Sequence, residues 1–63
     1  MGKTTVEQLI DLAKKIEGAE DGFEQWLNVM QYDGIAQEAI NEGTITQEEV
    51  TAIAREYSPT FAK

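Results

Sequence analysis

The chain has 63 residues and a net charge of −7, and it contains no Cys and no His. A chain of this length forms one domain at most and buries only about 60% of its unfolded surface, so its stability alone is marginal. The missing Cys excludes a disulfide and a Cys-based zinc site, which leaves well-packed helices or self-association as the expected support. The missing Cys also favours an intracellular, cytoplasmic location.

The first predicted helix covers about residues 6–17. Thr4 and Glu7 have the spacing of a capping box, in which a hydroxyl and a carboxylate satisfy free backbone N–H groups at the helix start. Gly18 is expected to end the helix in the left-handed conformation, and residues 1–4 are expected to be a loose end. The helix has an apolar stripe with Leu12 at its edge; the stripe consists of Val6, Leu9, Ile10, Ala13 and Ile16.

The second predicted helix begins after Asp21, which has Glu24 three residues later in the pattern of a capping box. Apolar side chains then recur with helical spacing on one face. Because Trp26 is the largest apolar side chain in the sequence, this face is predicted to be core, with Val29 widening it. The face consists of Phe23, Trp26, Leu27 and Met30.

A break in this helix is predicted at Asp33 and Gly34, since Asp caps helices well and Gly tolerates positive φ. A short separate helix is then expected over about residues 35–42. Gly43 is expected to end that short helix.

The last predicted helix covers residues 47–57. Thr46 and Glu49 form a further capping box at its start. Pro59 prevents the helix from continuing, and residues 59–63 are expected to be a loose end.

The periodicity is helical throughout, and no alternating apolar and polar run indicates a strand. The predicted fold is therefore all-α: a single compact domain of residues 1–63, a bundle of three main helices plus one short helix, with short loops and no sheet.

The sequence offers few side chains that could act as catalytic groups. Without His or Cys, the hydroxyl of Ser58 has no obvious base to activate it. Carboxylates can act as acid and base, but Glu20, Asp21 and Glu24 would need a cleft between them, and helix capping already explains acids at a helix start. We therefore predict that the chain is not an enzyme and has no cofactor.

A partial match to a calcium-binding EF-hand loop ends at Glu49. Gly43 and Ile45 occupy the expected glycine and apolar positions of such a loop. Ile40, however, stands where a calcium ligand is required, and it offers no side-chain oxygen. We therefore predict no metal site, and interpret this stretch as a connection between two helices.

The acids are distributed unevenly. The 39 residues from Ile16 to Ala54 contain no Lys or Arg, and such a surface repels phosphate and anionic lipid while attracting basic proteins. A helix-turn-helix alignment would also place Glu48 and Glu49 against DNA phosphates, so direct binding to nucleic acid and binding to a membrane are both excluded. The same 39 residues carry nine acids: Glu17, Glu20, Asp21, Glu24, Asp33, Glu38, Glu42, Glu48 and Glu49.

Two functional hypotheses follow from this charge pattern. In the first, the chain is a small acidic protein–protein interaction module, of the kind found in phages and mobile elements. It would inhibit a host protein by covering a basic, nucleic-acid-binding surface, with carboxylates taking the place of phosphates. The partner-binding residues predicted for this role are Glu17, Glu20, Glu24, Val29, Tyr32, Asp33, Glu38 and Glu42.

In the second hypothesis, the chain is a structural or accessory subunit that self-associates, for instance as a homodimer. The acids would then serve solubility alone. Apolar residues outside the tidy stripes would form the contact between copies, since Tyr, Phe and other large apolar residues are common interface anchors. These residues are Leu12, Val29, Tyr32 and Phe61.

Overall fold

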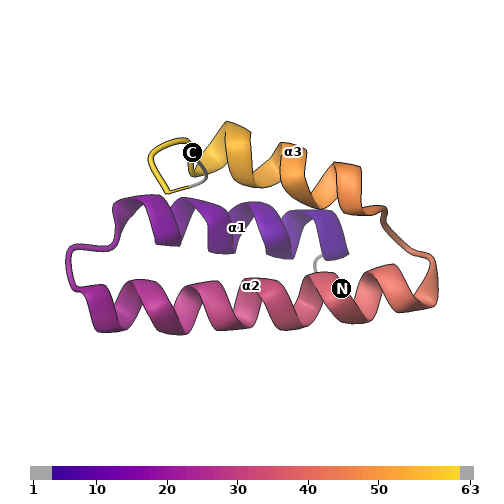
Figure 1. Cartoon of the computed structure of the whole chain (residues 1–63), viewed down its shortest axis with the longest axis horizontal. Coiled ribbons are helices and arrows are strands. Elements are labelled where there is room, and N and C mark those ends of the chain that lie inside the picture. The colour runs from indigo at the N-terminus through magenta and orange to yellow at the C-terminus, as the bar shows by residue number, and fades with distance from the viewer. Residues whose placement is uncertain (1–3, 62–63) are drawn as a thin grey trace.

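A computed structural model describes residues 4–61, which form three α-helices and no strand. The helices are α1 (Thr5–Gly18), α2 (Gly22–Glu42) and α3 (Gln47–Tyr57). α1 is the middle helix and contacts both of the others, whereas α2 and α3 contact each other less (Figure 1). α1 and α3 run in the same direction and α2 runs against them (Figure 1). The prediction of an all-α bundle is confirmed for this part of the chain; of the expected loose ends, residues 1–3 and 62–63 lie outside it.

Each helix begins at a side-chain cap that the sequence predicts. The Thr4 hydroxyl accepts a hydrogen bond from the backbone N–H of the third residue of α1 at 3.2 Å. The Asp21 carboxylate accepts from the N–H of Phe23 at 3.1 Å. At α3 the capping box is complete, because Thr46 accepts from the N–H of Glu49 at 3.2 Å and donates its own N–H to the Glu49 carboxylate at 3.3 Å. These local bonds fix where the helices start.

α2 is one continuous helix from Gly22 to Glu42. The predicted break at Asp33 and Gly34, and the separate short helix after it, are therefore wrong. A glycine inside a helix costs only about 1 kcal/mol relative to alanine. Burial of Tyr32, Ala36 and Ala39 in the core of the bundle outweighs that cost, because these three residues face the same way only if the helix continues.

The two predicted glycine caps differ in outcome. Gly43 ends α2 in the left-handed conformation, with φ 78°. The N–H groups of Gly43 and the next residue donate to the carbonyls of Ile40 and Ala39, which closes the helix end. Gly18, by contrast, is the last helical residue of α1, and the chain leaves α1 through Ala19 in an extended conformation with φ −70°. The predicted left-handed cap at Gly18 is thus wrong.

The core lies along α1 and receives side chains from both neighbours. Ser58 is the buried polar residue at its edge, and its hydroxyl donates a hydrogen bond to the backbone carbonyl of Ala13. This bond fastens the turn after α3 to the middle helix. The apolar core consists of Leu9, Leu12, Ala13, Ile16, Tyr32, Ala36, Ala39, Ile45, Val50 and Ile53.

Candidate protein-binding surface

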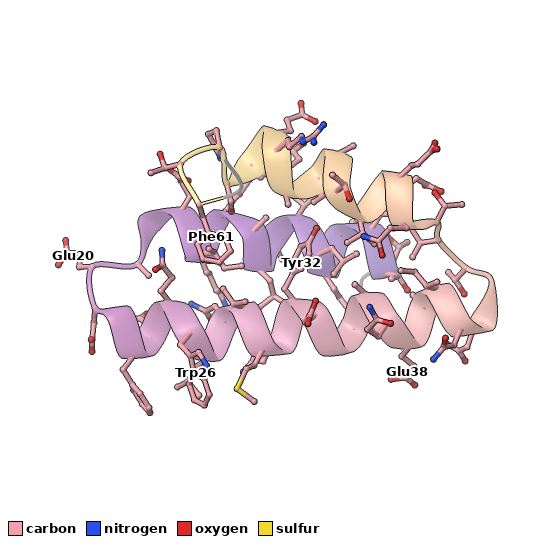
Figure 2. All side chains as sticks on the ribbon, in the orientation of Figure 1. Glu20, Trp26, Tyr32, Glu38 and Phe61 are labelled. Carbon is pink, nitrogen blue, oxygen red and sulfur yellow. The ribbon has the colours of Figure 1, made fainter. Side chains whose placement is uncertain are left out.

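The six acids predicted to contact a partner are all exposed: Glu17, Glu20, Glu24, Asp33, Glu38 and Glu42. They are spread over the molecule rather than gathered in one place. Figure 2 shows Glu20 in the link between α1 and α2, whereas Glu38 lies in the second half of α2, beside Thr5 and Gln8 of α1. Charge alone therefore does not define a compact site.

Glu17 has a structural partner that its sequence position did not reveal. Its carboxylate accepts a hydrogen bond from the backbone N–H of Thr60, 43 residues later, at 3.1 Å. The bond joins the end of α1 to the turn that follows α3. Glu17 is thus engaged in a contact between the end of α1 and the turn after α3, whereas Glu20 is exposed in the link between α1 and α2 (Figure 2) and remains a candidate for contact with a partner.

Two of the predicted partner residues belong to the core or its edge. Tyr32 is buried, and its hydroxyl donates to the backbone carbonyl of Val50 at 2.6 Å, which ties α2 to α3. Burial raises the pKa of the Tyr32 phenol above its ordinary value of 10.0, because the charged form would be poorly solvated. Val29 is half-buried against the core, and Leu12 is fully part of it. These residues are therefore not available as the centre of an interface.

The largest apolar side chains of α2 lie on the surface. Phe23 is 64% exposed, Trp26 55%, Leu27 40% and Met30 52%. Figure 2 shows Trp26 on the side of α2 opposite to α1. The prediction that these four residues form the core is wrong, and we refer to them below as the outer stripe.

The register of α2 explains why the outer stripe is exposed. Residues 29, 32, 36 and 39 are spaced for one helical face, and all four pack on the bundle. At about 100° per residue, residues 23, 26, 27 and 30 fall on the opposite face. The signal was present in the sequence: read as one helix, residues 22–42 carry two apolar faces, and only one of them can face α1.

The outer stripe forms a continuous patch. The rings of Phe23 and Trp26 are neighbours, with centroids 6.0 Å apart and planes inclined by 30°. Taking about 200 Å² for each ring, the two together leave roughly 240 Å² in solvent, and Leu27 and Met30 extend this area. A patch of this order is comparable to the largest one on a typical monomer, and such patches often mark an interaction site.

The apolar area alone gives a weak attachment. At 25 cal/mol per Å², covering both rings contributes about 6 kcal/mol. Loss of translational and rotational freedom on association costs about 4–15 kcal/mol, which consumes most or all of that gain. A stable complex at this surface therefore requires contributions beyond the two rings.

Carboxylates border the outer stripe on both edges. Glu24 precedes Leu27 by three residues, so the two side chains are neighbours on the helix surface. Asp33 follows Trp26 by seven residues and falls in line with it two turns later. α2 contains no Lys or Arg at all, and Lys14 on α1 is placed over the ring of Tyr57 at 5.6 Å, on the α3 side of the molecule. The charged side chains that α2 places beside the stripe are therefore all negative.

Residues 4–61 offer little support for a small-molecule site, a metal site or a membrane span. A shallow pocket of about 200 Å³ lies between the start of α1 and the second half of α2, smaller than the roughly 300–1,000 Å³ of typical ligand sites. Within the same residues, no group of three or more acidic side chains is arranged to hold a metal ion, and none of the three helices is long and apolar enough to cross a membrane. The pocket is lined by Thr5, Gln8, Ile35, Glu38, Ala39 and Glu42.

No family model matches this sequence, and no curated protein or solved structure matches it either. The outer stripe and its acidic border are therefore the features of the molecule that bear on function.

Proposed function

We propose that this chain is a small acidic protein-interaction module that acts by covering a basic surface of another protein. The observation that carries the proposal is an exposed apolar stripe on a helix that has acids and no bases. An apolar centre with a polar rim is the general anatomy of a protein interface.

Charge and apolar area have different roles in this proposal. The acids attract a basic protein over distance and orient it, which raises the association rate more than the final affinity. Phe23 and Trp26 lie side by side and expel water once contact is made, as aromatic anchors do in interfaces. The carboxylates therefore select a basic partner, and the two rings lengthen the time that this partner stays bound.

Inhibition by charge mimicry is the more specific form of this proposal. A basic surface that normally holds nucleic acid binds phosphates through Lys and Arg. Carboxylates spread over α2 would occupy the same cations and exclude the nucleic acid. The chain would then act by blocking its partner rather than by any chemistry of its own.

Affinity capture from a cell lysate tests the proposal with three matched baits. They are the unmodified chain, Glu24→Lys, and Glu48→Lys as the control. Both glutamates are exposed acids in the first turn of a helix, so the two substitutions change net charge and helix-end electrostatics alike. We expect the unmodified chain and the Glu48 variant to retain the same proteins. The Glu24 variant should lose these proteins, and rising salt should elute them.

Two outcomes of that capture would contradict the proposal. One is a set of retained proteins that is the same for all three baits. The other is a partner whose retention does not change between low and high salt. Elution of the captured protein by added duplex nucleic acid is the result expected for charge mimicry, whereas retention in its presence would leave a module that binds elsewhere on the partner.

Self-association is the second candidate function, and the exposure of the outer stripe is the observation that favours it. A homodimer or an accessory subunit would cover Phe23 and Trp26 with another copy of the chain. Light scattering at micromolar concentration measures the mass directly. A monomer mass would refute this candidate.

A further inference from the structure

We infer that the outer stripe of α2 is a docking surface for one basic amphipathic helix of a partner protein. The inference rests on the proposed function and makes it more specific. It names the occupant as a helix with an apolar face, flanked by Lys or Arg, that lies along the solvent side of α2.

The shape of the stripe favours a helix as the occupant. Its residues 23, 26, 27 and 30 have the spacing i, i+3, i+4 and i+7, which is how one helix presents apolar anchors to another. The stripe extends for about 10 Å along the axis, since each residue advances about 1.5 Å. α2 already packs on α1 through its other face, so the partner helix would add a further layer to the bundle.

The charge around the stripe favours a basic occupant. Glu24 and Asp33 lie along its two edges, and Glu20 lies just before the start of α2; all three are exposed. No Lys or Arg occurs between Ile16 and Ala54, so α2 itself supplies no positive charge to neutralise them. Lys or Arg residues beside the apolar face of a partner helix would meet carboxylates on both sides. An acidic helix of the same shape would meet repulsion on both sides.

A second copy of this chain fits the surface poorly. In an antiparallel pair centred on the stripe, Glu20 of one copy would lie opposite Asp33 of the other, and in a parallel pair Glu24 would lie beside Glu24. Like charges would therefore meet in either arrangement. The charge pattern therefore points away from a dimer and toward a basic partner.

A designed peptide tests this inference without knowledge of the natural partner. The probe is a synthetic helical peptide that has Leu on one face, Lys on the others, no Trp, and a fluorescent label. Two matched peptides replace Lys by Glu or Leu by Ser. Binding to the full chain is measured by fluorescence anisotropy at low salt. Trp26 is the chain's single Trp and lies within the stripe, so a shift of its emission to shorter wavelength reports where an unlabelled peptide binds.

We expect the Leu/Lys peptide to bind and both matched peptides to bind at least about tenfold more weakly. Phe23→Ser should weaken binding of the Leu/Lys peptide by about tenfold or more, because it removes a ring that the contact would cover. Phe61→Ser is the control, since it removes an equally apolar and 48% exposed ring from the turn after α3, and should change affinity by less than about twofold. Glu24→Lys should weaken binding more than Glu48→Lys, and added salt should reduce that difference.

Several results would overturn the inference. They are absence of binding by the Leu/Lys peptide, equal binding by the Glu peptide, and equal effects of the two Phe substitutions in variants that keep their helical circular dichroism. A dimer mass that Phe23→Ser abolishes would identify a second copy as the occupant. A larger Trp26 emission shift with phosphatidylcholine vesicles than with the peptide would identify a lipid surface. Charge-dependent capture of a protein combined with failure of the peptide would refute the helix while leaving the proposed function in place.

Discussion

Replacing Trp26 by Ala tests the exposure of the outer stripe most directly. Trp26 is 55% exposed, so of a side-chain area of about 200 Å² only about 90 Å² is covered, worth about 2 kcal/mol at 25 cal/mol per Å². The unfolded chain already covers part of that area. Ala also has a helix propensity better by about 0.5 kcal/mol. We therefore expect the free energy of unfolding to fall by about 1 kcal/mol or less.

Leu9→Ala is the matched substitution in the core. Leu9 is fully buried, and truncating such a residue costs about 2–5 kcal/mol because it leaves a cavity. A domain of this length has a total stability of about 3–9 kcal/mol, so this variant should be close to unfolded or should lose much of its stability. Truncation of the larger side chain, Trp26, is therefore expected to lower the free energy of unfolding less than truncation of the smaller Leu9.

Urea denaturation followed by helical circular dichroism measures both variants. Fluorescence is unsuitable here, because Trp26→Ala removes the only Trp. The midpoint should shift little for Trp26→Ala and strongly for Leu9→Ala, with similar slopes. A loss for Trp26→Ala as large as that for Leu9→Ala would show that the outer stripe is buried in solution, and the candidate surface would be refuted with it.

Three further predictions follow from the same structure. Gly34→Ala should raise the free energy of unfolding by about 0.5–1 kcal/mol, because Gly34 is helical and a Cβ there meets no atom within 4 Å. Gly43→Ala should lower the free energy of unfolding by about 1–2 kcal/mol, because Gly43 has a φ of 78°. Thermal unfolding of the two variants checks these opposite signs. Tyr32→Phe should cost about 1 kcal/mol through loss of the bond to Val50. Because burial raises the pKa of Tyr32 in the folded state above 10.0, the unfolded chain loses this proton first as pH rises. The stabilisation from the Tyr32 phenol is therefore complete below about pH 10 and declines as pH rises through the folded pKa. When the free energy of unfolding is measured against pH, the share of the decline that comes from Tyr32 should be missing in Tyr32→Phe. Acrylamide should quench the emission of Trp26 in the free chain nearly as well as that of free tryptophan, and efficient protection would contradict its exposure.

The features that the sequence predicted well depend on neighbouring residues. α3 begins and ends where predicted, at Gln47 and Tyr57, because the Thr46 and Glu49 bonds are local and Pro59 blocks extension. Gly43 adopts the left-handed conformation for an equally local reason. Side-chain capping and backbone sterics act within a few residues, so their outcome can be read from a short window of sequence.

The features that the sequence misjudged depend on contacts between helices. Gly34 stays helical because residues on either side of it pack on the bundle, and that packing is invisible in the sequence around it. Glu17 is engaged by Thr60, a residue distant in sequence that the fold brings to the end of α1. Ser58, an unremarkable residue before Pro59, becomes a buried link to α1 for the same reason.

An all-α chain, its helix caps and a long segment without bases can be read from the sequence alone. Packing against α1, by contrast, selects which of two apolar faces of α2 is buried. Periodicity shows that residues share a face, but it does not say which face meets α1. The smaller residues Ala36 and Ala39 are the ones in the core, and Phe23 and Trp26 are left in solvent. That choice converts the strongest core signal in the sequence into the candidate binding surface.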